Sequence, residues 1–117
     1  MKNTYWFLGV QITRWVSDDE PGIVECRFTD RFGRKWYVIE KAPVVSSAKI
    51  GHDSRFPQQT WIACKVMSRH LDDIGREVAE INTLDPWGIE ATDGTSNFQV
   101  FGHQLVPLHR GFDLLSG

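Results

Sequence analysis

Closely spaced turn motifs constrain this chain more than any other feature. Asp30–Gly33 (DRFG) and Asp72–Gly75 (DDIG) both begin with Asp and end with Gly, as type I turns prefer. Asp93-Gly94 is a pair typical of two-residue hairpin turns. Short apolar runs flank each motif, and almost none keeps a helical period over ten residues. The sequence therefore predicts three β-hairpins.

One register of the first hairpin explains both of its strands. Pairing Asp30 with Arg34 places Phe28 opposite Trp36, and alternate residues then form one apolar face. The other face is mixed and carries Glu25, Arg27, Thr29, Lys35, Tyr37 and Ile39. This alternation is typical of an antiparallel hairpin that is buried on one side.

Two further apolar segments also predict antiparallel strands. Residues 5–16 predict a strand with Leu8, Val10 and Ile12 on one side. The Asp93-Gly94 pair predicts a third hairpin in which Ile89 lies opposite Phe98.

We expect one domain over residues 1–117, all-β, folded as a small six- to seven-stranded antiparallel barrel or curved sandwich built from hairpins. A sheet this small needs curvature to protect its edges. Residues 42–59 form the one long irregular segment, in which Val44 and Val45 predict a short strand.

Composition favours a cytoplasmic protein with no membrane partner. The formal net charge of −2 gives no reason to expect a polyanion. Gln11, Thr13 and Arg14 interrupt the first apolar run too early for a signal peptide or a spanning helix. Cys26 and Cys64 alternate with apolar residues, which predicts buried, reduced thiols.

No catalytic or metal-binding motif stands out, so we expect no cofactor and favour a non-enzymatic role. Whether His52, His103 and His109 converge is left open by the sequence. An enzyme with an unrecognised site near His52, Asp53, Arg55 and His103 is the third alternative for function.

Two segments are candidates for contact with a partner protein. Trp15 stands beside the acidic loop Asp18, Asp19 and Glu20, and exposed aromatic residues often anchor interfaces. Packing of Trp15 into the core is the competing interpretation. Arg55 and Phe56, in the long 42–59 segment, form the alternative contact surface.

The tip of the first hairpin offers a different alternative. Arg31, Arg34 and Lys35, together with Tyr37, could contact nucleic acid. The same charges could simply keep an exposed turn soluble, and nearby Asp30, Glu25 and Glu40 reduce the local positive charge.

The stretches GIVECRFTDRFGRKWYVIEKAPVV and DPWGIEATDGTSNFQV resemble an uncharacterised family of small bacterial β-barrel proteins. Their hairpin-rich run is also similar to the second-domain barrel of translation elongation factors. The resemblance implies a bacterial source and a stand-alone barrel, and it supplies no catalytic residues.

These observations favour a non-enzymatic protein-binding module. One version is an immunity-type protein that masks a toxin. The alternative is a small-barrel protein that binds nucleic acid or associates with ribosomes. The oligomeric state is left open.

Overall fold

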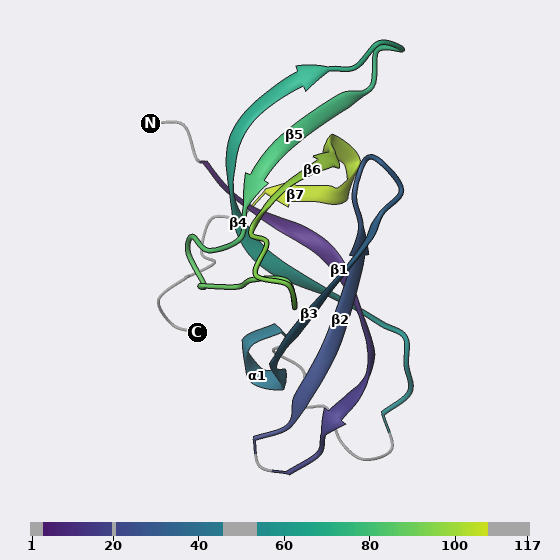
Figure 1. Ribbon diagram of the computed structural model, residues 1–117, viewed down its shortest axis with the longest axis vertical. Coiled ribbons are helices and arrows are strands. Elements are labelled where there is room, and N and C mark those ends of the chain that lie inside the picture. Colours follow the sequence, from purple (N-terminus) through teal and green to yellow (C-terminus); the bar gives the residue numbers. More distant parts are fainter. Residues whose placement is uncertain (1–3, 20, 46–53, 108–117) are drawn as a thin grey trace.

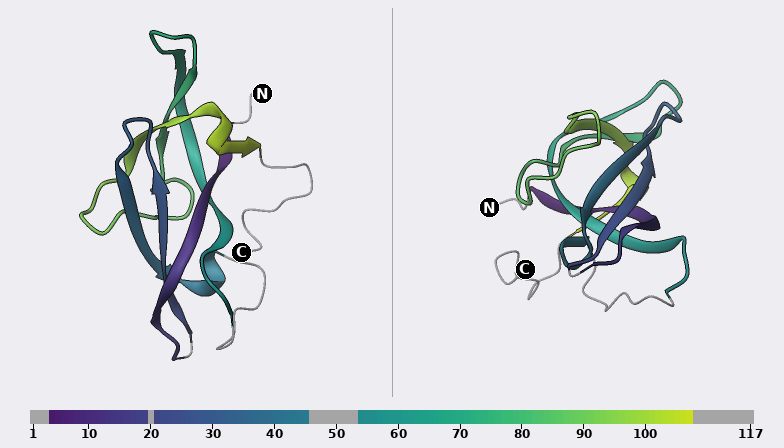
Figure 2. Two further views of the ribbon diagram at one scale, coloured as in Figure 1. Left: turned by 90° about the vertical axis from the view of Figure 1, so that its right-hand side faces the viewer. Right: turned by 60° about the horizontal axis from the view of Figure 1, so that its bottom comes forward.

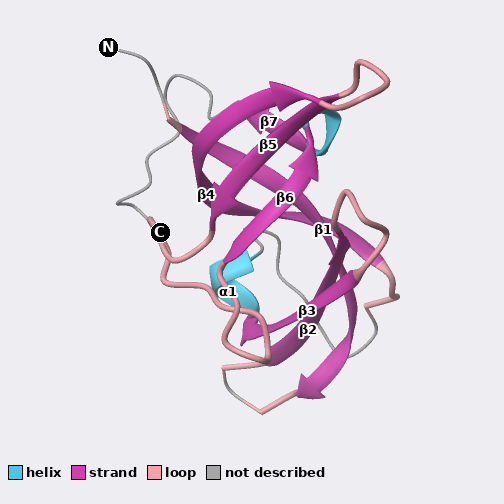
Figure 3. Cartoon of the chain, turned by 45° about the horizontal axis from the view of Figure 1, so that its top comes forward, coloured by secondary structure: helices cyan, strands magenta, loops and turns pink. Residues whose placement is uncertain are grey.

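An antiparallel sheet curled into a half-barrel makes up most of the molecule (Figure 1). The computed structural model describes residues 4–19, 21–45 and 54–107. Their strands are β1 (Tyr5–Ser17), β2 (Ile23–Thr29), β3 (Lys35–Lys41), β4 (Gln58–Leu71), β5 (Glu77–Asn82), β6 (Asn97–Phe101) and β7 (Leu105–Pro107). A short helix α1 (Ala42–Val45) and a 3-10 turn η1 (Gly102–Gln104) complete the described elements (Figure 3). The all-β prediction is confirmed.

Strand β1 is the centre of the sheet, whose order is β3-β2-β1-β4-β5-β6. Along one edge, the first part of β1 pairs with β7, as at Leu8 with Leu105, and the later part pairs with β2, as at Gln11 with Arg27. Its other edge pairs with β4. After β6, η1 turns the chain so that β7 returns to β1 (Figure 2).

The core lies on the concave side of the sheet. The predicted inner residues Leu8, Val10 and Ile12 are all buried, with at most 2% of each side chain exposed. They pack into one cluster with apolar residues from each of the strands β2 to β7. These residues are Val24, Cys26, Phe28, Val38, Ile62, Cys64, Ala79, Ile81, Phe98, Val100 and Leu105. Burial of an aliphatic side chain of this size contributes about 1.5–3 kcal/mol, so this face fixes which side of each strand points inward.

Irregular pairing supplies the curvature. The β1–β2 register shifts twice, between Ile12 and Arg14 and again after Trp15, and the β4–β5 register shifts after Val66. Such bulges bend and twist a strand.

The two end strands of the sheet also receive hydrogen bonds from outside the ladder. The Arg31 N–H donates to the Gln99 carbonyl of β6 at 2.9 Å. The Thr92 N–H donates to the Tyr37 carbonyl of β3, also at 2.9 Å. The tip of the β2–β3 hairpin therefore lies against β6, and the 83–96 loop lies against β3. Both contacts reduce the exposure of a sheet edge.

The predicted first hairpin is confirmed residue by residue. Phe28 pairs with Trp36, and the Asp30 N–H donates to the Arg34 carbonyl at 2.9 Å. Gly33 has a φ of 82°, which closes the turn. The second predicted turn, between β4 and β5, has the same bond pattern from Asp72.

The predicted pairing of the third hairpin is wrong. Phe98 pairs with Ile81 of β5, and the Ile89 N–H donates to the Thr83 carbonyl. A turn does form at Gly94, but Ala91 bonds to Thr95 and the whole 83–96 segment stays a loop. Ile89 is buried because this loop packs against the core. The apolar residues of the loop therefore follow the pattern that is expected of a strand.

The predicted strand at Val44 and Val45 is also wrong, because these residues belong to α1. Pro43 suits the first turn of a helix, where its missing N–H is not needed. The turn buries Ala42 and Val45, and the Val45 carbonyl accepts a hydrogen bond from the Thr60 hydroxyl.

Gly94→Val should destabilise the protein by about 1–3 kcal/mol, because Gly94 has a φ of 90° that a branched residue adopts only under strain. Urea unfolding measures the change. Thr92→Val is the matched control, since it changes an exposed residue of the same turn and should unfold at the parent midpoint. Equal midpoints for the two variants would contradict the turn geometry.

Candidate functional site

A groove of about 510 Å³ lies between the β2–β3 tip and strands β5 and β6. It is lined by Asp30, Phe32, Arg34 and Trp36 of the hairpin, by Met67, Glu80 and Ile81 of β4 and β5, and by Asn97, Phe98 and Gln99 of β6. Two of its apolar side chains face solvent, since Phe32 is 67% exposed and Met67 is 57% exposed. We call this set of residues the tip groove.

The Asp30 carboxylate holds one wall of the tip groove. Its Oδ1 accepts hydrogen bonds from the N–H groups of Phe32 (2.9 Å) and Arg34 (3.0 Å). Its Oδ2 accepts from the Trp36 indole Nε1 at 2.8 Å. The Trp36 ring also packs edge-on against Phe98, with centroids 5.0 Å apart. One buried side chain thus closes the turn and fixes the indole beside it.

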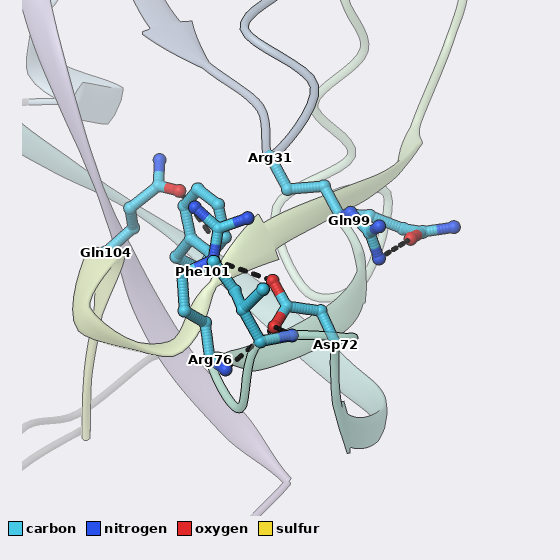
Figure 4. Close-up of polar contacts among 7 residues, drawn as sticks. Arg31, Asp72, Arg76, Gln99, Phe101 and Gln104 are labelled. Atoms are coloured by element: carbon cyan, nitrogen blue, oxygen red, sulfur yellow. Dashed lines mark hydrogen bonds and ion pairs between the residues drawn. The ribbon is translucent and has the colours of Figure 1, made fainter.

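The two arginines of the tip are already engaged. The Arg34 guanidinium lies 3.9 Å from the Trp36 ring centroid, and its Nη2 is 3.7 Å from the Asp93 carboxylate. The Thr95 N–H, and to a lesser degree Arg34, lower the pKa of Asp93. Arg31 donates to the Gln99 side chain at 3.3 Å, and Figure 4 shows it reaching across to β6. The groove lining carries one cation, Arg34, and two carboxylates, Asp30 and Glu80, so the groove is not basic.

Figure 4 also shows the neighbouring turn of the β4–β5 hairpin. There the Arg76 Nε donates to Asp72 at 2.7 Å, while the Arg76 guanidinium lies 4.7 Å from the Phe101 ring centroid. Hydrogen bonds from Arg76 and Ile74 lower the pKa of Asp72 against an opposing effect of burial. This arginine is a structural part of its own turn.

A second surface lies on the convex side of the sheet. Cross-strand pairing aligns Gln59, Gln11, Arg27 and Tyr37 in one row over β4, β1, β2 and β3. A polar groove of about 370 Å³ follows part of this row and also includes Gly9, Thr29, His103 and Gln104. Trp61 pairs with Gly9 next to the row. We call this surface the outer face.

The structure thus divides the four residues predicted to contact nucleic acid. Arg34 lines the tip groove, and Arg31 reaches from the same turn to Gln99 of β6. Lys35 and Tyr37 alternate to the outer face, because Tyr37 pairs with Arg27.

The two predicted protein-contact segments lie together. The rings of Trp15 and Phe56 meet edge to face with centroids 6.0 Å apart, and both are half-buried against the core. The Trp15 indole nitrogen is buried and has no hydrogen-bond partner among the described residues. Asp18, Asp19 and Arg55 are exposed, whereas Glu20 lies outside the described residues. Trp15 therefore offers less apolar surface than an exposed anchor would.

The residues considered for chemistry do not form a site within the described ranges. His103 is exposed and stacks on Phe101, with centroids 5.7 Å apart. His52, Asp53 and His109 lie outside those ranges. Among residues 4–19, 21–45 and 54–107, no three His, Cys, Asp or Glu side chains gather as metal ligands. None of the helices in these ranges could cross a membrane.

Searches against protein families, characterised proteins and solved structures gave no match for this chain. The resemblance to small bacterial barrels and to the elongation-factor domain stays a prediction.

Sequence reasoning missed the most exposed apolar residues of the tip groove and the row on the outer face. Phe32 was seen only as a turn residue, and Met67 only as part of an alternating strand. The row on the outer face can be recognised only when the β1–β4 and β1–β2 registers are known. No local sequence motif determines these registers.

Asp30→Asn should lower the free energy of unfolding by about 1–3 kcal/mol, the usual cost of an unsatisfied buried group. The new amide nitrogen would face the Trp36 Nε1 donor in place of Oδ2, while Oδ1 could still close the turn. Urea unfolding measures the loss. Asp72→Asn is the control, because its second oxygen bonds the Arg76 guanidinium, which is 56% exposed and can turn to water, and a smaller loss is expected. Parent stability in Asp30→Asn would refute the role given to this carboxylate.

The buried thiols should react slowly in the native protein. Burial, helped by the charges of Glu40 and Glu25, raises the pKa of Cys26 from 9.0 to about 12, and burial alone raises that of Cys64 equally. A thiol reagent at pH 8 should label both only after unfolding.

The same shift predicts how stability depends on pH. An unfolded thiol loses its proton near pH 8.5, whereas the folded thiols keep theirs to about pH 12. The unfolded state therefore binds fewer protons between these values, and stability should fall with rising pH. Rapid native labelling, or constant stability from pH 8 to 11, would contradict the core placement of both cysteines.

Proposed function

We propose that this protein is a non-enzymatic protein-binding module and that the tip groove receives an apolar side chain of its partner. The observation that carries the proposal is the exposure of Phe32 and Met67 at the two sides of a groove with Trp36 in its wall. Aromatic and Met side chains are enriched in protein interfaces, and pockets of this kind hold the residues that dominate affinity.

The charges of the groove, one arginine and two carboxylates, support a protein partner over a polyanion at this site. Arg34 is stacked on Trp36 and lies near Asp93, while Glu80 accepts a hydrogen bond from Ser68. A polyanion would need cations that are free to pair with phosphates. A partner with an aliphatic or aromatic side chain and a mixed polar rim matches the groove better.

Pre-organisation also favours binding. The Asp30 carboxylate fixes both the turn and the Trp36 ring, so little ordering would remain when a partner binds. A protein that masks another, as an immunity-type protein masks a toxin, would use such a rigid surface. The bacterial cytoplasm is the proposed setting, and the free buried thiols are compatible with a reducing compartment.

The test replaces Phe32 by Ser. The protein is used to isolate its partner from the native host, and isothermal titration calorimetry then measures the affinity of the purified partner. Phe32→Ser should weaken binding at least tenfold, because it removes the most exposed apolar wall of the groove. Its own stability should change by less than about 0.5 kcal/mol, as is usual at an exposed position.

Ile74→Ser is the matched control. Ile74 is 73% exposed and lies at the tip of the β4–β5 hairpin, outside the groove. The Ile74→Ser variant should bind the partner with the same affinity as the parent protein. Equal affinities for the parent and Phe32→Ser would remove the tip groove as the contact surface and return attention to Trp15 and Asp19.

A further inference from the structure

We propose that the outer face is a second binding surface and that its ligand is a single-stranded nucleic acid. The residues of this face on which the proposal rests are Gln11, Arg27, Lys35, Tyr37, Lys41, Gln59 and Trp61. They are separate from the tip groove, since none of these seven side chains lines that groove.

Among the residues that the structure describes, no ion pair joins Arg27, Lys35 or Lys41 to a carboxylate. Within the described residues, Arg27 makes one polar contact, to the Gln11 amide oxygen at 3.5 Å. The neighbouring carboxylate, Glu25, accepts from the Thr13 hydroxyl at 2.6 Å and from Arg14 at 3.0 Å. The Thr13 bond first, Arg14 next and the charge of Arg27 last lower the pKa of Glu25, and both oxygens of this carboxylate are already hydrogen-bonded to Thr13 and Arg14.

Two lysines extend the positive charge along β3. Lys35 and Lys41 are exposed on the same side of the strand as Tyr37. They are six residues apart, which is roughly 20 Å along an extended strand. The carboxylate between them, Glu40, alternates to the other side, where its charge helps raise the pKa of buried Cys26. Arg27, Lys35 and Lys41 thus lie on one face, which they share with the single carboxylate of Glu25 among the described residues of β2 and β3.

Two aromatic rings lie on the same face as these cations. Trp61 on β4 is 38% exposed and Tyr37 on β3 is 37% exposed. The Trp61 ring covers Gly9 so closely that a Cβ there would lie 3.0 Å from it. Exposed rings on a basic sheet surface stack with unpaired bases, and each such stack is a substantial part of single-strand affinity.

Two side-chain amides, those of Gln59 and Gln11, lie on the part of the face between Trp61 and Arg27. The side chains of Gln59 and Gln11 are adjacent in the row that leads to Arg27 and Tyr37. Amide groups both donate and accept hydrogen bonds, so they suit the edges of unpaired bases. Stacking rings, base-edge amides and cations together favour a single strand over a duplex, whose bases are stacked inside.

The experiment measures binding of a fluorescein-labelled 15-nucleotide oligo-uridine by fluorescence anisotropy at several KCl concentrations. Contact of three phosphates with Arg27, Lys35 and Lys41 predicts a slope of log K against log [KCl] of about −2, at about −0.7 per phosphate. Arg27→Gln and Lys35→Gln should each weaken binding and reduce the slope by about 0.7. Melting curves first establish that each variant is folded.

Arg34→Gln is the matched control. It removes the same charge from the position next to Lys35, but its side chain lies in the tip groove. It should leave both affinity and slope unchanged. Phe32→Ser should also bind the oligonucleotide like the parent, which separates failure of this proposal from failure of the proposed protein-binding function.

Tyr37→Ala tests stacking apart from charge. It should lower affinity for the oligonucleotide at least about fivefold without changing the salt slope, and Tyr37→Phe should retain binding. Heparin serves as a polyanion without bases, and its binding should not respond to Tyr37→Ala.

Three results would overturn the proposal. The first is the absence of salt-dependent binding, and the second is an equal effect of Arg34→Gln and Lys35→Gln. The third is oligonucleotide binding that Tyr37→Ala leaves unchanged, since the face would then attract any polyanion.

Discussion

The hydrogen bonds of the Asp30 carboxylate are the contact on which the β2–β3 hairpin depends. They bind two backbone N–H groups of the turn and the Trp36 indole at once. Because the turn fixes the register, they also decide which side chains face each surface. Phe32, Arg34 and Trp36 reach the tip groove, whereas Lys35 and Tyr37 reach the outer face. A slip of one residue would exchange these sets.

The rest of the sheet holds this hairpin in place. Strand β1 pairs with β2, β4 and β7, so most of the fold is joined through one buried stripe of Leu8, Val10 and Ile12. The bond from Arg31 to Gln99 then ties the hairpin tip to β6. The tip groove exists because these two parts of the chain, far apart in sequence, meet there.

The sequence could predict what local chemistry decides. Asp30 and Asp72 with their glycines set two hairpins, and the alternation along β1 showed its buried side. The third hairpin failed because β6 pairs with β5, a distant partner, while the 83–96 loop buries Ile89 without forming a strand. The prediction used the local alternation of apolar residues. This alternation does not distinguish a loop that packs against the core from a strand.

The two candidate surfaces also depend on strand pairing that local sequence patterns do not predict. The sequence predicts Arg31, Arg34, Lys35 and Tyr37 as one basic tip, but the structure divides them. Arg31 and Arg34 of the turn lie at β6 and the tip groove, whereas Lys35 and Tyr37 of β3 face the other side. The row from Gln59 to Tyr37 combines three strand registers, and only folding reveals it.

The β2–β3 hairpin separates the apolar tip groove from the outer face with its cations. The most direct test follows the indole N–H signals of the five tryptophans in a ¹H–¹⁵N spectrum during titration with oligo-uridine. The Trp61 signal should shift progressively, while the Trp36 signal, bonded to Asp30, should stay in place. A shift of Trp36 with Trp61 unmoved, or equal shifts of both, would contradict the separation of the two surfaces.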